Sequence, residues 1–177
     1  MKSKLISISA ISSAFVAIVL TIGVYFNMAD LFCLVVASVF VMLPLYYKSH
    51  LAGFLSCLAG GVIAFIFSGF NFLIVTVPAY FVFFGVFPLV KNLMEEKNVN
   101  KYVRYLIGLV WCVLAVYGMF FFYKNVMSLD FSDLPVFVKD NLVIVVGLLG
   151  VIFYVVYERF LTAFRRIIDE LLKKVLK

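Results

Sequence analysis

The chain alternates between long apolar stretches and short polar ones. A helix needs ~20 residues to cross ~30 Å of hydrocarbon, and the apolar stretches are close to that length. The second, third and sixth are slightly short, so we expect local thinning of the bilayer, less tilt or partial burial by neighbours. The predicted spans are Leu5–Phe26, Asp30–Tyr47, Leu51–Ser68, Phe70–Val90, Tyr102–Tyr123 and Asn141–Tyr157.

The composition agrees with a protein whose solvent is lipid. Hydrophobic residues make up 66% of the 177-residue chain, and its mean hydropathy is +1.18. A soluble domain is usually about 45–50% apolar, so one water-soluble core would not hide this surface. Lys2 and Lys4 precede the first apolar run as in a signal peptide, but no clear cleavage site follows. We therefore expect a retained first helix.

The basic residues lie on one side of the predicted membrane. Of the 15 Lys and Arg residues, only Lys124 and Lys139 fall outside one alternate set of loops and ends. Positive loops stay in the cytoplasm, which predicts that both termini are cytoplasmic. Asn27–Asp30, Gly69–Asn71 and the loop Lys124–Asp140 then face outward. The net charge of +6 follows from this topology, so we do not expect nucleic-acid binding.

The last segment has a different pattern. After Tyr157, apolar residues recur at helical spacing and charged residues occupy the other face. This pattern predicts a basic amphipathic helix at 158–177, following a six-helix transmembrane domain at 1–157. Two interpretations stay open: the helix lies on the anionic inner leaflet, or it binds a cytoplasmic partner. The predicted fold class is an all-α membrane protein.

Small residues recur at helical spacing in two of the spans. In the third span they form a stripe whose members lie four residues apart, with Gly53, Cys57 and Gly61 beside it. Small side chains let two helices approach closely, so we expect this helix to be central. The first span carries the related pair Ala10 and Ala14, which either packs within the protein or forms a docking groove for a partner helix. The stripe of the third span is Ala52, Ser56, Gly60, Ala64 and Ser68.

No motif for catalysis or metal binding stands out. His50 is the only histidine and lies in a predicted loop, where we expect it to be solvated. Cys33, Cys57 and Cys112 lie inside apolar spans and are expected to be small core residues. No span has an ionisable residue at its middle, which disfavours an ion-coupled carrier or an intramembrane protease. We expect neither an enzyme nor a cofactor.

Aromatic and polar residues gather in the outward halves of the spans and in the outward loops. Aromatic walls with a few amides and carboxylates are typical of a small-molecule pocket, although an interfacial aromatic belt has the same composition. Pro78 lies deepest within a span, where a bend would open room for a ligand. The candidate substrate-binding residues are Asn27, Asp30, Asn71, Tyr80, Trp111, Tyr117, Tyr123, Asn125 and Asn141.

These features resemble the substrate-binding S components of energy-coupling factor vitamin transporters. S components have six helices and cytoplasmic termini, and their AxxxA motif corresponds here to Ala10-Ile11-Ser12-Ser13-Ala14. The segment Phe83–Lys91 is also similar to Gram-positive membrane proteins associated with this fold. The resemblance implies that a small water-soluble nutrient binds from outside. It also implies that Ala10 and Ala14 dock onto a transmembrane coupling subunit that carries two ATPases. The expected location is then the bacterial cell membrane.

A membrane scaffold is the alternative function. Proteins of rod-shape assemblies of the MreD kind have a similar size and also lack catalytic residues. The predicted amphipathic tail fits such a role, in cell-envelope or sporulation assembly. A receptor would be stabilised by its ligand and a scaffold would not.

Overall fold

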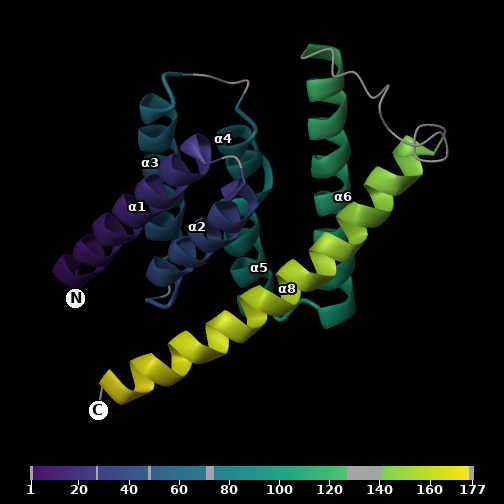
Figure 1. Cartoon of the computed structure of the whole chain (residues 1–177). Helices are drawn as coiled ribbons and strands as arrows, with labels where there is room; N and C mark the ends of the chain where they lie inside the picture. Colours follow the sequence, from purple (N-terminus) through teal and green to yellow (C-terminus); the bar gives the residue numbers. More distant parts are fainter. Residues whose placement is uncertain (1, 27, 48, 71–73, 127–140, 176–177) are drawn as a thin grey trace. The chain divides into compact units, whose positions relative to one another are not determined.

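The computed structural model describes residues 2–26, 28–47, 49–70, 74–126 and 141–175, and in these ranges it is helical without strands (Figure 1). Five helical segments are long and apolar enough to cross a membrane, whereas the apolar helix α2 has only 16 residues. The all-α class is thus confirmed for the described residues, with five of the six expected spans long and apolar enough to cross a membrane. The elements are α1 Lys2–Tyr25, α2 Asp30–Leu45, α3 His50–Phe67, α4 Thr76–Ala79, the π-helix η1 Tyr80–Phe84, α5 Phe87–Glu96, α6 Lys101–Val126 and α8 Leu142–Val175.

The chain divides into two compact units, residues 1–129 and residues 130–177. The first unit contains every helix from α1 to α6, and the second contains α8. The 34 residues of α8 form one helix, about 51 Å long at 1.5 Å per residue. The predicted boundary between residues 157 and 158 therefore falls inside a helix. No proline or glycine lies between residues 151 and 175 to break it.

The fourth span is shifted relative to its prediction. Gly69 and Phe70 adopt left-handed backbone conformations, with φ of 70° and 57°, and they end α3. The helix resumes at Thr76 instead of Phe70 and continues to Glu96, beyond the predicted end at Val90. Hydropathy reflects the depth of a residue in the membrane, whereas the ends of a helix are set by backbone conformation. The boundaries predicted from hydropathy therefore differ from the observed helix ends.

Pro78 is followed directly by a π-helical turn. The amide of Gly85 donates to the carbonyl of Tyr80, five residues earlier, at 2.7 Å. Proline lacks the N–H that a regular helix would use, and π-turns are one of the local rearrangements associated with helix distortion. The expected irregularity of the fourth span is thus present as α4, η1 and α5 in series.

Helix α3 is closely packed along its small-residue stripe, although α2 contacts as many elements of the first unit. It contacts α1, α2, α4, η1 and α5. A Cβ atom on Gly60 would lie 2.5 Å from Cγ1 of Val16 and 3.0 Å from the carbonyl oxygen of Ser13, both on α1. Two helical turns earlier on the same side of α3, a Cβ on Gly53 would meet Leu45 of α2 and Leu89 of α5. Glycine therefore sets the spacing of α3 from several neighbours.

Serine hydroxyls connect the first three helices. The Ser12 hydroxyl of α1 donates to the carbonyl of Phe40 on α2 at 2.6 Å. The Ser56 hydroxyl of α3 donates to the carbonyl of Ser9 on α1 at 3.1 Å. Ser12 and Ser56 are both buried. These bonds satisfy the hydroxyls without water and fix the register between helices.

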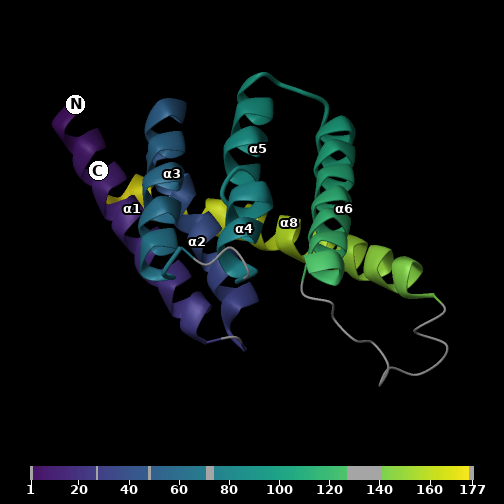
Figure 2. The same cartoon turned by 90° about the horizontal axis from the view of Figure 1, so that it is seen from above.

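Helix α6 is less closely attached to the first unit. Its main contacts are with α5 and η1. Figures 1 and 2 show α1 to α5 gathered side by side, with α6 set apart from α1 and α3. One long face of α6 is therefore not covered by the other helices of this unit.

Candidate functional site

The candidate substrate-binding residues come from several helices. At one end of the first unit, α1, α3 and α6 begin and α5 finishes. We call this the basic end, because it carries Lys4, Lys91, Lys97, Lys101 and Arg104. Asp30 opens α2 and Asn125 lies near the end of α6, so both belong to the opposite end.

Three other candidate residues lack a described place in this unit. Asn27 and Asn71 lie outside the described residues. Asn141 precedes α8 in the other unit. The predicted outward pocket therefore stays a prediction.

Tyr80 is a packing residue of the bundle. Its side chain is fully buried, and its hydroxyl donates to the carbonyl of Cys57 on α3 at 3.3 Å. Its ring lies against two glycines, because Cβ atoms on Gly61 and Gly85 would each lie 3.0 Å from its Cε1 atom. Tyr80 thus packs the π-helical turn against α3.

The aromatic candidates on α6 contact other aromatic rings. Trp111 meets the rings of Phe83 and Phe87 edge-on, each at 6.4 Å between centroids. Tyr117 stacks on Phe121 of its own helix at 6.5 Å. Tyr123 is buried, and its hydroxyl has no hydrogen-bond partner within the described part of the chain. That hydroxyl is thus a buried polar group at the opposite end without a partner among the described residues.

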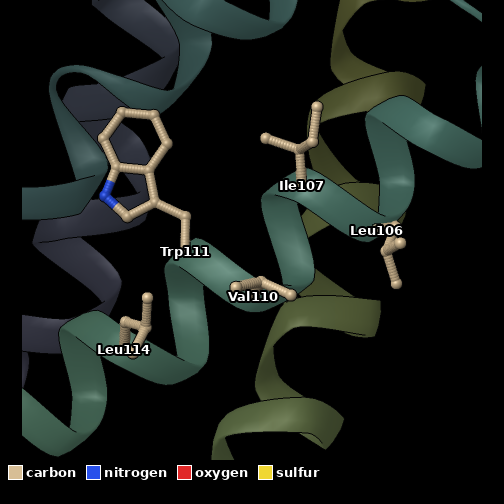
Figure 3. A pocket seen from close by; sticks show the side chains of 5 residues that line it. All are labelled: Leu106, Ile107, Val110, Trp111 and Leu114. Atoms are coloured by element: carbon tan, nitrogen blue, oxygen red, sulfur yellow. The ribbon is translucent and has the colours of Figure 1, made fainter.

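An apolar groove runs along α6. It has a volume of about 410 Å³, opens to the surface, and is lined by Leu106, Ile107, Val110, Trp111 and Leu114 (Figure 3). These side chains offer hydrocarbon and one indole ring but no charged group. The groove therefore suits an apolar occupant and lacks the polar groups that would orient a water-soluble solute.

Polar contacts gather at the basic end. His50 is the first residue of α3, so its interpretation as a loop residue was wrong. Its side chain is 34% exposed, in keeping with the expected solvation, but its Nε2 atom also lies 2.6 Å from Oε2 of Glu96. The Asn92 amide donates to the other oxygen of Glu96 at 3.1 Å. Arg104 of α6 lies 3.4 Å from Glu95. The adjacent acidic pair Glu95 and Glu96 was the available sequence signal.

This cluster holds helix ends together. The contacts connect the start of α3, the end of α5 and the start of α6. No group of three potential metal ligands occurs within the described ranges. The three cysteines are buried and form no disulfide among the described residues, as expected of small core residues.

Helix α1 presents two different faces. Ser12, Val16 and Leu20 are buried against the other helices, whereas Ala10 and Ala14 are exposed. The exposed pair lies between the exposed isoleucines Ile6 and Ile18 on the same i, i+4 row. On this row the two small side chains lie between larger ones, and we call the exposed pair Ala10 and Ala14 the notch.

Comparisons of the chain with protein-family models, with curated proteins and with solved structures find no match.

Proposed function

We propose that the protein is a non-catalytic membrane subunit that works by docking a partner's transmembrane helix along the exposed face of α1. The supporting observation is the notch at Ala10 and Ala14, which no helix of the first unit fills. In lipid, helix association depends on close van der Waals packing, so exposed small residues favour a close helix contact. The proposed topology has six crossings, with both termini in the cytoplasm.

The resemblance to S components gives this proposal its specific form. The protein would be the substrate-binding subunit of an energy-coupling factor importer for a small water-soluble nutrient, and the partner would be the coupling subunit with its two ATPases. The buried hydroxyl of Tyr123, which has no partner among the described residues, supports a solute site at the end opposite the basic end. Asn125 and Asp30 lie at the same end of the first unit.

A scaffold is the second candidate function. Two observations favour it: Tyr80 and Trp111, which were expected to face a solute, pack against other side chains, and the described groove is apolar. A continuous α8 of about 51 Å also exceeds the ~30 Å of the hydrocarbon core. In the proposed topology it would extend into the cytoplasm, where its amphipathic end could hold an assembly partner.

The docking proposal is tested by blocking the notch. Ala10→Trp combined with Ala14→Trp should abolish co-purification with a coexpressed coupling subunit, while size-exclusion elution and helical content stay unchanged. The matched control places two tryptophans on the exposed face of α3, at Leu55 and Leu58. Co-purification that survives the α1 pair, or that is lost equally with the α3 pair, contradicts docking through α1.

A thermal-shift screen separates receptor from scaffold. A receptor gains ~2.7 kcal/mol at a hundredfold excess of ligand over its dissociation constant. The purified protein would be screened against vitamins and their precursors. A stabilising compound whose effect disappears in Tyr123→Phe supports the receptor form, and the absence of any stabilisation favours the scaffold.

A further inference from the structure

The groove on α6 has both an apolar wall and a cationic end. We propose that it binds one anionic phospholipid, with an acyl chain along Leu106 to Leu114 and the phosphate group at Arg104. This site is distinct from the notch on α1 and does not depend on the proposed function.

The apolar part of the site follows from its lining. Leu106, Val110 and Leu114 lie on one i, i+4 row, with Ile107 and Trp111 on the neighbouring row. The row covers about 12 Å along the helix axis, at 1.5 Å per residue. Leu106 and Leu114 are 62% and 64% exposed, so the groove is accessible from the side. A flexible hydrocarbon chain can follow such a surface without requiring a hydrogen-bonding partner.

The cationic end lies in register with the groove. Arg104 precedes Ile107 by three residues and Trp111 by seven, which places all three along the same side of α6. The Nη1 atom of Arg104 lies 3.4 Å from Oε1 of Glu95. A guanidinium has five N–H donors, so N–H groups remain for a phosphate after one carboxylate is bound. Arginine is well suited to phosphate because its planar fork can donate two parallel bonds.

The surrounding charges favour an anionic headgroup. Lys97 and Lys101 are exposed on the connection between α5 and α6, and Lys91 is buried one helical turn before Glu95. The neighbouring acidic groups are Glu95 and Glu96, and Glu96 is held by His50. Cations thus outnumber carboxylates here, which attracts an anionic phosphate. A phospholipid supplies the acyl chain and the anion in one molecule, whereas an apolar partner helix would fill the groove without adding an anion, so we favour the lipid.

The test measures lipid retention by the full-length protein. Delipidated protein in detergent would be titrated with phosphatidylglycerol or phosphatidylcholine, and bound lipid would be counted by native mass spectrometry. We expect one phosphatidylglycerol to be retained with about tenfold preference, because both lipids offer a phosphate to Arg104 but only phosphatidylcholine also carries a cation, which the neighbouring Lys and Arg side chains repel. Arg104→Gln should remove the preference but leave weak binding of both lipids.

A second variant tests the apolar part. Val110→Trp should fill the groove and abolish retention of the bound lipid. The controls are Lys4→Gln, which removes one exposed charge at the same end on α1, and Leu58→Trp, which adds the same bulk on α3. Both should retain the lipid like the unchanged protein.

Three results would overturn the proposal: equal retention of the two lipids by the unchanged protein, a preference that survives Arg104→Gln, or retention that survives Val110→Trp. If Val110→Trp leaves lipid binding unchanged but disrupts a complex with another protein, the occupant is a helix instead. Lipid retention is measured without a coupling subunit, so its outcome is independent of the docking test on α1.

Discussion

Two small-residue rows, one on α3 and one on α1, look alike in sequence and lie in opposite surroundings. On α3, Ser56, Gly60 and Ala64 are buried, and α1 approaches Gly60 so closely that a methyl group would not fit. On α1, Ala10 and Ala14 are exposed. The first row positions the bundle's own helices, and the second is available for a contact outside it. Spacing alone therefore identifies a surface for close approach but not the helix that uses it.

The largest effect should come from enlarging the buried row. Gly60→Leu places carbon atoms where Val16 and the Ser13 carbonyl already lie, and overpacking of this kind costs about 3 kcal/mol. The expected result is a strong loss of thermal stability in detergent, measured by the unfolding transition. Gly118→Leu is the control, because no described atom lies within 4 Å of a Cβ at that position. Equal losses in the two variants would contradict close packing at Gly60.

A smaller loss is expected at the contact between the π-turn and α3. A Cβ on Gly85 would lie 2.6 Å from the sulfur of Cys57 and 2.9 Å from the ring of Tyr80. Gly85→Ala should destabilise the protein by about 2 kcal/mol. Adding Cys57→Ala should restore part of this loss, because it removes one of the two obstacles. A double variant whose stability equals the sum of the single effects would show that the two positions are uncoupled.

Removing one hydroxyl between helices should have a still smaller effect. Ser12→Ala deletes the 2.6 Å bond to Phe40. Such bonds in membranes contribute about 0.6 kcal/mol on average. The unfolding transition of Ser12→Ala should therefore shift slightly but measurably. In Ser7→Ala, whose hydroxyl bonds only within α1 and is exposed, the shift should be smaller.

The smallest effect on folding is expected at the exposed row. Ala14→Leu adds bulk to a surface that faces no other helix of the unit, so stability should change by less than about 0.5 kcal/mol. The same substitution should weaken the proposed docking, which would separate a contact surface from a packing surface. A large loss of stability in Ala14→Leu would show that α1 is buried on this side and would remove the basis for docking.

Sequence reasoning succeeded where a single physical signal dominated. The stripe on α3 predicted its close packing, because only small side chains allow several helices to approach one another so closely. Apolar length predicted membrane-spanning helices. The same signal misplaced the fourth helix, since Gly69, Phe70 and Asn98 end helices through left-handed backbone conformations that hydropathy does not record.

Candidate site residues were harder to assign. Tyr80 and Trp111 are residue types common in ligand pockets. In the structure, however, Tyr80 packs the π-helical turn against α3, and Trp111 contacts the rings of Phe83 and Phe87. His50 was expected in water and also pairs with Glu96, 46 residues away. The polar atoms of an aromatic or imidazole side chain can bond equally well to a solute, to water or to the protein. The residue type therefore does not indicate which of these the side chain contacts.

By itself, the sequence determined that the chain is helical, that several helices can cross a bilayer, and that α3 would lie closely packed. The tertiary structure decided which face of each helix is inside. In a membrane protein the lipid-facing and buried faces are both apolar, so amphipathic periodicity does not distinguish them. Only the fit between neighbouring helices does, and that fit placed Gly60 inside and left Ala10 and Ala14 on the surface.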